Sequence, residues 1–221
     1  MMNNRIEVLR GLLNYHYYTY KLRDSEQVPG VWKKATLLIL LSGLVFGVSA
    51  YFGIGSEYLS KQLTSVSRAE YEMQKLLFMI GQTILGLFFG AVMIFLPALF
   101  FWTLSDLELK KLVAVQLFVI PVLLLEKVLV IPLAILLGLT EISSPFSLGI
   151  LAQYITGNEF LIQLLSTMSI FKLWIIFIEY KYLKMLMERN PKIILVIVIS
   201  INLIIWLFAA LFSFIQFEKI L

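Results

Sequence analysis

The sequence predicts an all-α, polytopic integral membrane protein with five transmembrane helices and an amphipathic amino-terminal helix. Three observations lead to this fold class. Of the 221 residues, 60% are hydrophobic, and the mean hydropathy is +0.91. Only 14% are charged, which is about half the fraction found in soluble domains. Five apolar segments are long enough to cross about 30 Å of hydrocarbon at 1.5 Å per residue. Basic residues also gather in alternate connecting segments, as they do in multi-span membrane proteins.

The chain divides into a short amino-terminal segment, residues 1–34, and one membrane domain, residues 35–221. The amino-terminal segment has apolar residues at helical spacing, which predicts a helix lying in the membrane interface. These residues are Ile6, Leu9, Leu13, Tyr17 and Tyr20. Because charges are scattered through the opening of the chain, we expect no cleaved signal peptide, and the first span acts as its own insertion signal.

The five spans are predicted in the most apolar parts of the membrane domain. They lie near 35–54, 76–103, 113–139, 161–179 and 193–217. Two of the connecting segments, 55–75 and 141–160, are expected outside the cell. The first mixes both charges and reads as a loop with a short helix, whereas the second has no basic residue.

The orientation follows from the lysines and arginines that flank the spans. Twelve lie on one side: Arg5, Arg10, Lys21, Arg23, Lys33, Lys34, Lys110, Lys111, Lys181, Lys184, Arg189 and Lys192. Four lie on the other: Lys61, Arg68, Lys75 and Lys219. Since basic residues favour the cytoplasmic side, we expect a plasma-membrane protein with its amino terminus in the cytoplasm and its carboxyl terminus outside.

The residue inventory argues against an enzyme. The chain has no cysteine and one histidine, His16, so thiolate chemistry, histidine metal sites and a serine–histidine dyad lack their parts. No sequence typical of a serine hydrolase, a zinc protease or a phosphate-binding loop occurs. We therefore expect neither a cofactor nor a metal. The basic, tyrosine-rich opening fits the headgroup region of a lipid bilayer better than nucleic acid.

Two pairs of glycines are spaced for close helix packing. Gly43 and Gly47 lie in the first predicted span, and Gly86 and Gly90 lie in the second. A glycine every four residues lets two backbones approach closely in lipid. The pairs predict contact between the first two spans, or alternatively a homo-oligomer.

Three charged residues fall inside predicted spans. Glu126 and Lys127 are neighbours in the third span, and Lys172 lies at comparable depth in the fourth. A charge near the middle of a bilayer costs about 3 kcal/mol or more, so it is expected to face other helices or a polar cavity. These residues are interpreted either as paired structural charges or as the lining of a cavity or docking surface.

One stretch resembles a known family. Residues 144–174, SPFSLGILAQYITGNEFLIQLLSTMSIFKLW, resemble the second half of the Yip1-domain family, whose members have five spans and a cytoplasmic amino terminus. The matching positions are Pro145, Phe171 and Trp174. The family often carries an acid two residues before the phenylalanine, whereas this chain has Ser169 there. The resemblance is to the bacterial YknW-like type, which implies an accessory of an ABC-type exporter.

The sequence is consistent with two alternative functions. The first is a non-catalytic membrane accessory that binds or assembles an ABC-type exporter or toxin-resistance complex, a function that the resemblance implies. The second is a small transporter or channel that uses Glu126 and Lys172. Against the second, the sequence shows no matched halves with broken helices, as many transporters have.

Overall fold

The computed structural model describes residues 15–24, 28–56, 67–139 and 143–215. These residues are helical almost throughout, and the described part of the chain holds no β-structure beyond one isolated bridge between Ser147 and Ser169. Its helices are α2 (Tyr15–Asp24), α3 (Val31–Tyr51), α5 (Arg68–Thr103), α6 (Leu109–Leu137), α7 (Gly149–Ile155), α8 (Glu159–Ser166), α9 (Ile170–Leu186) and α10 (Pro191–Ile215). Four of them, α3, α5, α6 and α10, are long and apolar enough to cross a membrane. The predicted all-α membrane class is confirmed at this level.

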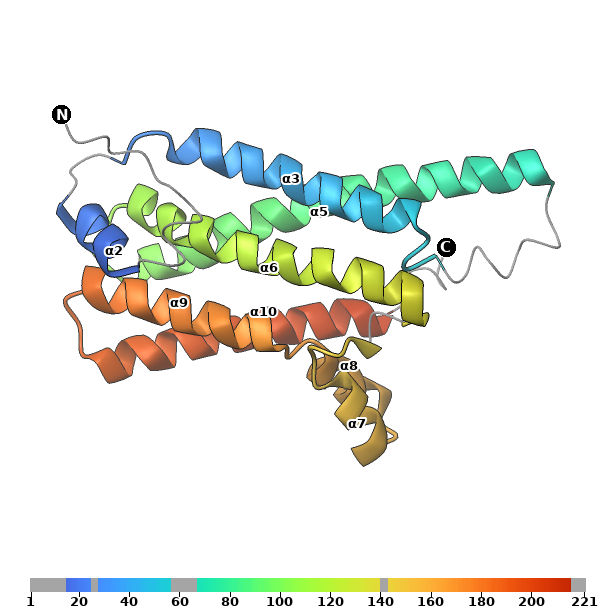
Figure 1. Ribbon diagram of the computed structural model, residues 1–221. Helices are drawn as coiled ribbons and strands as arrows, with labels where there is room; N and C mark the ends of the chain where they lie inside the picture. Colours follow the sequence, from blue (N-terminus) through green and yellow to red (C-terminus); the bar gives the residue numbers. More distant parts are fainter. Residues whose placement is uncertain (1–14, 25–27, 57–66, 140–142, 216–221) are drawn as a thin grey trace.

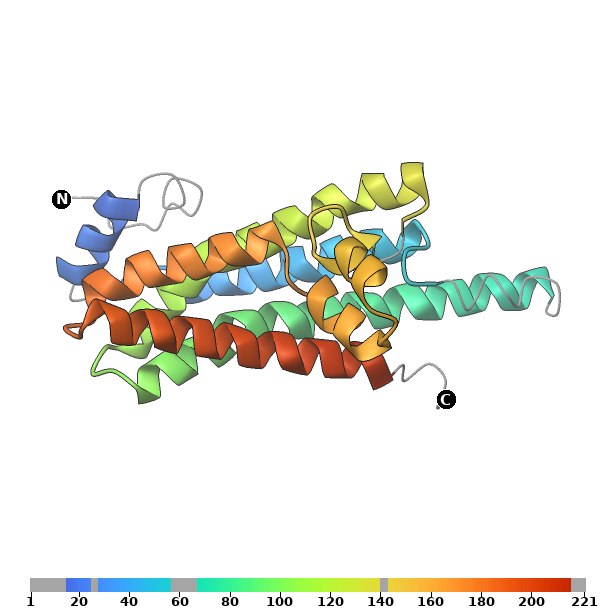
Figure 2. The ribbon, with the colours of Figure 1, turned by 90° about the horizontal axis from the view of Figure 1, so that it is seen from below.

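The long helices and α9 run side by side along one direction, while α2 lies across one end of the bundle (Figure 1). The short helices α7 and α8 form a hairpin beside the bundle, nearer its other end (Figure 2). Helix α6 is central near α2, since residues 112–120 are almost all buried around its whole circumference. Towards its carboxyl end one face opens, and Leu136 is 79% exposed. This exposed apolar surface is what lipid requires of a membrane helix.

Local sequence explains where several helices begin and end. Ser67 accepts a hydrogen bond from the Glu70 amide at the start of α5, and this serine and glutamate are spaced as in a capping box. Asn158 caps α8 and Ser169 caps α9 in the same manner. Helix α6 ends at Gly138, whose φ of 62° is a conformation that glycine adopts without a steric penalty.

Helices α3 and α5 pack antiparallel at very short range through their glycines. A Cβ atom added at Gly86 would lie 2.6 Å from Cβ of Phe46, and one added at Gly47 would lie 2.6 Å from Oγ1 of Thr83. Gly43 and Gly90 face the partner helix equally closely. The Ser42 hydroxyl also donates a buried hydrogen bond of 2.7 Å to the Gly86 carbonyl. The structure thus places all four predicted packing glycines in one contact within the chain.

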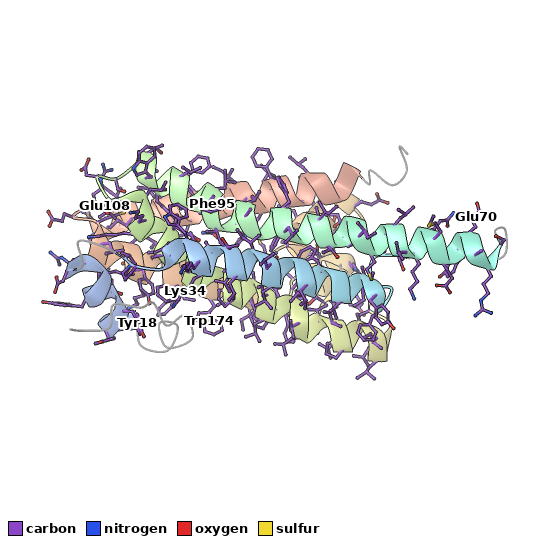
Figure 3. The ribbon with its side chains drawn as sticks, turned by 90° about the horizontal axis from the view of Figure 1, so that it is seen from above. Tyr18, Lys34, Glu70, Phe95, Glu108 and Trp174 are labelled. Atoms are coloured by element: carbon purple, nitrogen blue, oxygen red, sulfur yellow. The ribbon has the colours of Figure 1, made fainter. Side chains whose placement is uncertain are left out.

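Helix α2 closes one end of the bundle with aromatic contacts. Tyr18 and Leu22 are buried, and the Tyr18 ring meets Phe118 of α6 edge-on with centroids 6.1 Å apart. Phe118 in turn stacks on Tyr182 of α9 at 4.8 Å. Aromatic pairs at such distances add to the stability gained from burial alone. Figure 3 shows Tyr18 at the end of the molecule opposite Glu70.

The exposed side of α2 carries two residues of the predicted interfacial stripe. Tyr17 and Tyr20 are 53% and 63% exposed, while the other stripe residues, Ile6, Leu9 and Leu13, lie outside the described residues. The interfacial helix therefore stays a prediction.

The fourth predicted span, 161–179, is wrong as a single helix. Helix α8 ends at Ser166 and α9 begins at Ile170, because Thr167, Met168 and Ser169 form a break between them. Serine and threonine can form hydrogen bonds to nearby backbone groups and so favour helix ends. The prediction missed this break because the residues on both sides of it are apolar.

The start of the second span also differs from its prediction at residue 76. Helix α5 starts at Arg68, so the predicted loop 55–75 ends earlier than expected. The capping box at Ser67 explains this start. The bounds of α3, α6 and α10 differ from their predicted spans by four residues or fewer.

Candidate functional site

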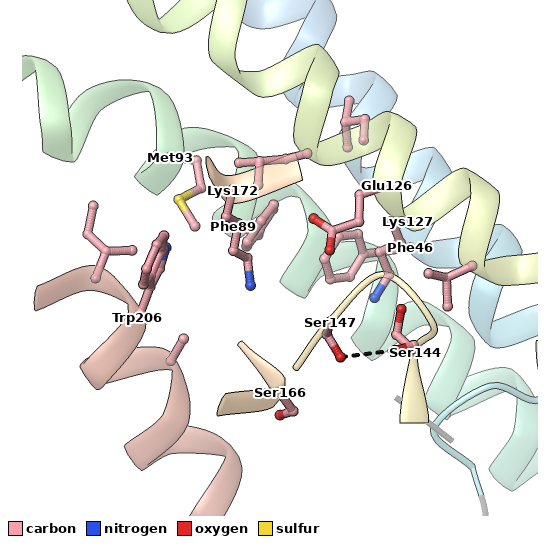
Figure 4. Close-up of a pocket in the computed structure, with 15 residues that line it drawn as sticks. Phe46, Phe89, Met93, Glu126, Lys127, Ser144, Ser147, Ser166, Lys172 and Trp206 are labelled. Atoms are coloured by element: carbon pink, nitrogen blue, oxygen red, sulfur yellow. Dashed lines mark hydrogen bonds between the residues drawn. The ribbon is translucent and has the colours of Figure 1, made fainter. Parts of the chain in front are cut away.

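A cavity of about 250 Å³ lies inside the bundle, where α3, α5, α6, α10 and the segment from α6 to α9 converge (Figure 4). Its polar lining consists of Glu126, Lys127, Lys172, Ser144, Ser147 and Ser166. Its apolar lining consists mainly of Phe46, Phe89, Met93, Leu123, Leu124, Val130, Ile205 and Trp206. A mostly apolar pocket with a few converging polar groups is the usual form of a small-molecule site.

All three charged residues predicted inside spans line this cavity. Glu126 and Lys127 reach it from α6, and Figure 4 shows their charged ends directed into it. The Lys127 ammonium lies 3.9 Å from the centroid of the Phe46 ring, a favourable cation–π contact. Glu126 accepts no hydrogen bond from any residue that the structure describes. Its carboxylate therefore depends on solvent, or on a bound molecule, for hydrogen bonds.

Lys172 enters the cavity from the first turn of α9. Its ammonium donates a hydrogen bond to the Thr167 carbonyl, which is one of the carbonyls left without a helical partner at the end of α8. The dipole of α8 favours a cation at this carboxyl end, whereas the dipole of α9 disfavours one in its first turn. Lys172 interacts electrostatically with Glu126, but the two described side chains form no direct ion pair. The cavity is thus lined by one negative group, Glu126, and two positive groups, Lys127 and Lys172.

The broken helix forms the wall that carries the serines. The Leu148 amide donates to the Met168 carbonyl at 2.9 Å, and the Ile170 amide donates to the Phe146 carbonyl at 3.1 Å. These two bonds clamp the start of α9 against the segment that follows α6. The α7–α8 hairpin connects the two clamped segments, and it lies next to the cavity, because Ser166 of α8 lines it. The sequence Ser-Pro-Phe-Ser therefore positions Ser144 and Ser147 rather than forming a loose loop.

The family-motif residues lie around this clamp. Phe171 packs edge-on against Phe146 with centroids 5.4 Å apart. Pro145 is exposed, and Trp174 is 39% exposed on the outer side of α9. Only Phe171 helps to hold the cavity wall. None of the three lines the cavity itself.

A second polar group lies deeper in the bundle. Glu179 of α9 is 2% exposed. One of its carboxylate oxygens accepts a hydrogen bond of 3.0 Å from Nε2 of Gln116, and the other accepts one of 2.6 Å from Nδ2 of Asn202. Asn202 Nδ2 also donates to the Val198 carbonyl, which fixes the orientation of its amide. Three helices, α6, α9 and α10, are joined through this one carboxylate.

A smaller cavity of about 20 Å³ lies beside the cluster of Glu179 with Gln116 and Asn202, here called the Glu179 cluster. Its lining includes Gln116, Glu179, Asn202 and also Lys172, which lines the larger cavity as well. Oε1 of Gln116 is buried without a hydrogen-bond partner among the described residues. A space of this size is sufficient for one water molecule. Lys172 therefore lines both the 250 Å³ cavity and the small cavity beside the Glu179 carboxylate.

The Glu179 cluster was not predicted from the sequence. Gln116, Glu179 and Asn202 lie in three different apolar segments, and each on its own looks like an isolated polar residue. The available signal was that polar residues within the membrane face other helices. Their mutual contact depends on helix rotation, which hydropathy does not report.

The arrangement offers charged and hydroxyl groups that could bind a ligand. No set of three histidine, aspartate or glutamate side chains that could hold a metal ion occurs in the described residues. The chain matches none of the family models, curated proteins or solved structures with which it was compared.

Proposed function

We propose that the chain crosses the membrane five times, with its amino terminus in the cytoplasm and its carboxyl terminus outside. Support for the fifth crossing comes from α9, which returns along the bundle and joins α10 through a short turn at residues 187–190. Its 17 residues extend about 25 Å at 1.5 Å per residue, so it needs the hairpin to complete the crossing. The basic residues Lys110, Lys111 and Arg189 gather at the α2 end, which supports a cytoplasmic position for that end.

We propose that this plasma-membrane protein binds a small polar molecule in the 250 Å³ cavity, as a small transporter or ligand-binding protein. The observation that supports this proposal is the convergence of Glu126 and Lys172 on a cavity beside a broken helix. Charged groups within a membrane bundle mark substrate or ion pathways, and discontinuous helices commonly form such sites. The protein acts by binding and carries out no chemical step.

The first experiment measures whether water reaches the cavity. The chain has no native cysteine, so Ser147→Cys introduces a single thiol at the cavity wall. We expect a small, water-soluble thiol reagent to label it in proteoliposomes. The control is Ser200→Cys, which is exposed on the outer surface of α10 and should face lipid, where the reactive thiolate does not form. Labelling of Ser147→Cys only after unfolding would contradict an accessible cavity.

Transport itself requires a flux measurement. Purified protein in liposomes should exchange a small labelled ligand identified by binding, and Glu126→Gln should reduce that exchange. Binding without exchange would favour a ligand-binding protein over a transporter.

A second candidate function, the accessory of an ABC-type exporter, is supported by the length of α5. Its 36 residues extend about 54 Å at 1.5 Å per residue, beyond a hydrocarbon core of about 30 Å. Figure 1 shows its amino-terminal part projecting past the other helices. Met73 and Leu77 lie near this end of α5 and are 62% and 59% exposed. Leu77 falls at the edge of the predicted span 76–103, whereas Met73 precedes it, and an exposed apolar residue outside lipid is typical of a protein contact.

The test of this candidate is purification in mild detergent at native expression. An exporter that co-purifies with the original chain but not with the Met73→Ser, Leu77→Ser variant would support the accessory function. A chain that elutes alone would contradict that function. A homo-oligomer is tested by the mass of the same eluted particle. The glycines are already engaged between α3 and α5, so they offer little surface for a second copy.

A further inference from the structure

The electrostatic arrangement of the cavity restricts the ligand that it can hold. This inference rests on the proposed binding function and concerns the chemical class of the ligand. Glu126 and Lys172 both reach the cavity, and they interact electrostatically without a direct ion pair between them. A molecule that lies between them meets a negative group on α6 and a positive group on α9.

Each charged group has unused hydrogen-bonding capacity. The Glu126 carboxylate accepts no hydrogen bond from a described residue, although a carboxylate can accept several. The Lys172 ammonium carries three donors, and the Thr167 carbonyl takes one of them. Charge-assisted hydrogen bonds are stronger than neutral ones. A ligand that supplies both a donor cation and an acceptor anion satisfies both groups.

Ligands with a single charge fit less well. An acid alone would bind Lys172 but would meet the Glu126 carboxylate, and an amine alone would meet the ammonium groups of Lys172 and Lys127. Like charges brought together in a site of low polarity are strongly unfavourable. The pair therefore selects for a dipolar molecule whose two charged groups point in opposite directions.

The remaining lining sets the size and polarity of the rest of the ligand. The cavity volume of about 250 Å³ is below the roughly 300 Å³ at which drug-sized sites begin. Ser144 offers a hydroxyl donor at one wall, since the Ser147 and Ser166 hydroxyls already donate to the Ser144 and Gln163 carbonyls. Phe46, Phe89 and Trp206 offer apolar surface. The lining suits a small molecule with a short apolar part.

We propose that the cavity binds a small zwitterion, with a primary ammonium and an acid group a few bonds apart and a short apolar part. The ammonium lies against Glu126, and the acid group lies against Lys172 and the Ser144 hydroxyl. Two sources provide this chemistry: a free apolar amino acid, and the phosphoethanolamine head group of a lipid. The serines lie in a wall built by the broken helix, so the same clamp that interrupts the fourth predicted span creates the ligand-binding wall.

The experiment measures binding to the full chain in detergent by calorimetry, with three probes of matched apolar part. These are leucine, 3-methylbutylamine, which lacks the acid, and 4-methylpentanoate, which lacks the amine. We expect leucine to bind at least tenfold more tightly than either analogue. Equal binding of the acid and of leucine would overturn the proposal. A separate arm replaces leucine with glycerophosphoethanolamine, a phosphodiester with the charges of the lipid head group, and preference for that probe assigns the head group as the source.

Variants connect the binding to the named residues. Glu126→Gln keeps the shape of the side chain and should weaken zwitterion binding at least tenfold, while Glu70→Gln, an exposed change on the projecting part of α5, should leave it unchanged. A Glu126→Gln protein that elutes normally and binds leucine as the original does would contradict the proposal. If Ser147→Cys is labelled but none of the probes is distinguished, the ligand class fails while the accessible cavity stands. If Ser147→Cys is not labelled, the proposed function fails as well.

Discussion

The Glu179 carboxylate lies 2.6 Å from Nδ2 of Asn202, and this hydrogen bond joins α9 to α10 inside the apolar bundle. Both residues are less than 10% exposed. A buried polar group that loses its partner costs about 1–3 kcal/mol. Since Gln116 bonds to the same carboxylate, Glu179 holds together three helices that carry little other polar contact.

The first prediction concerns this hydrogen bond. Asn202→Leu removes a donor from Glu179 and should destabilise the protein by about 1–3 kcal/mol, which thermal unfolding in detergent would detect as a lower midpoint. Glu179→Leu combined with Asn202→Leu should lose less than the sum of the single changes, because the two side chains share one interaction. Glu188→Gln is the control, since Glu188 is exposed in a surface ion pair with Arg23. Additive losses would mean that the contact contributes nothing.

The second prediction concerns the α3–α5 contact. Gly86→Ala would place a Cβ atom 2.9 Å from the Ser42 carbonyl oxygen as well as against Phe46, so the two helices must separate and the unfolding midpoint should fall. Overpacking of a tight contact typically costs about 1–3 kcal/mol.

Gly81 is the matched control on the same helix, because an added Cβ there meets nothing within 4 Å. Gly81→Ala should leave the midpoint unchanged or raise it, since alanine favours the helix. Equal effects at the two glycines would show that helix propensity, and not close packing, determines the result.

Hydropathy was sufficient to predict the long apolar helices. The glycine spacing predicted close helix packing, but it left open whether the contact joins the first two spans or two copies of the chain. Hydropathy failed at 161–179, where the helix is interrupted at Thr167–Ser169 although the residues on both sides are apolar. Hydropathy averages over a window longer than this break. The predicted charges Glu126 and Lys172 do share a site, but the serines of the opposite wall depend on a chain reversal that no periodic pattern reveals. The Glu179 cluster was missed for the same reason, because it forms only in three dimensions.

The third prediction tests the break directly. Ser147 and Ser169 face each other in an antiparallel bridge, and the flanking residues, not these two, make the backbone hydrogen bonds. Such non-hydrogen-bonded pairs have Cα atoms about 4.5 Å apart, which is within the range of a disulfide. The double variant Ser147→Cys and Ser169→Cys should therefore oxidise readily, and the two thiols should become unavailable to alkylation.

The matched control pairs Ser147→Cys with Ser200→Cys on α10. Since the chain has no native cysteine, any loss of free thiols reports the introduced pair alone. If 161–179 were one continuous helix, Ser169 would lie in its interior and would not form the bridge, and oxidation would be no faster than in the control.

The last prediction concerns orientation, and it uses the two ends of the bundle. Glu70 lies on the projecting tip of α5, and Arg189 lies in the exposed turn between α9 and α10, near α2 (Figures 1 and 3). Lysines and arginines are concentrated at the Arg189 end, and basic residues favour the cytoplasm. An impermeant thiol reagent added to intact cells should therefore label Glu70→Cys but not Arg189→Cys, while both should react after the membrane is permeabilised. The reverse pattern would place the amino terminus outside and would direct the projecting part of α5, with its exposed Met73 and Leu77, towards cytoplasmic rather than external partners. Labelling of both positions in intact cells would mean that an even number of crossings separates them. Helix α9 would then not cross the membrane, and the proposed five crossings would be wrong.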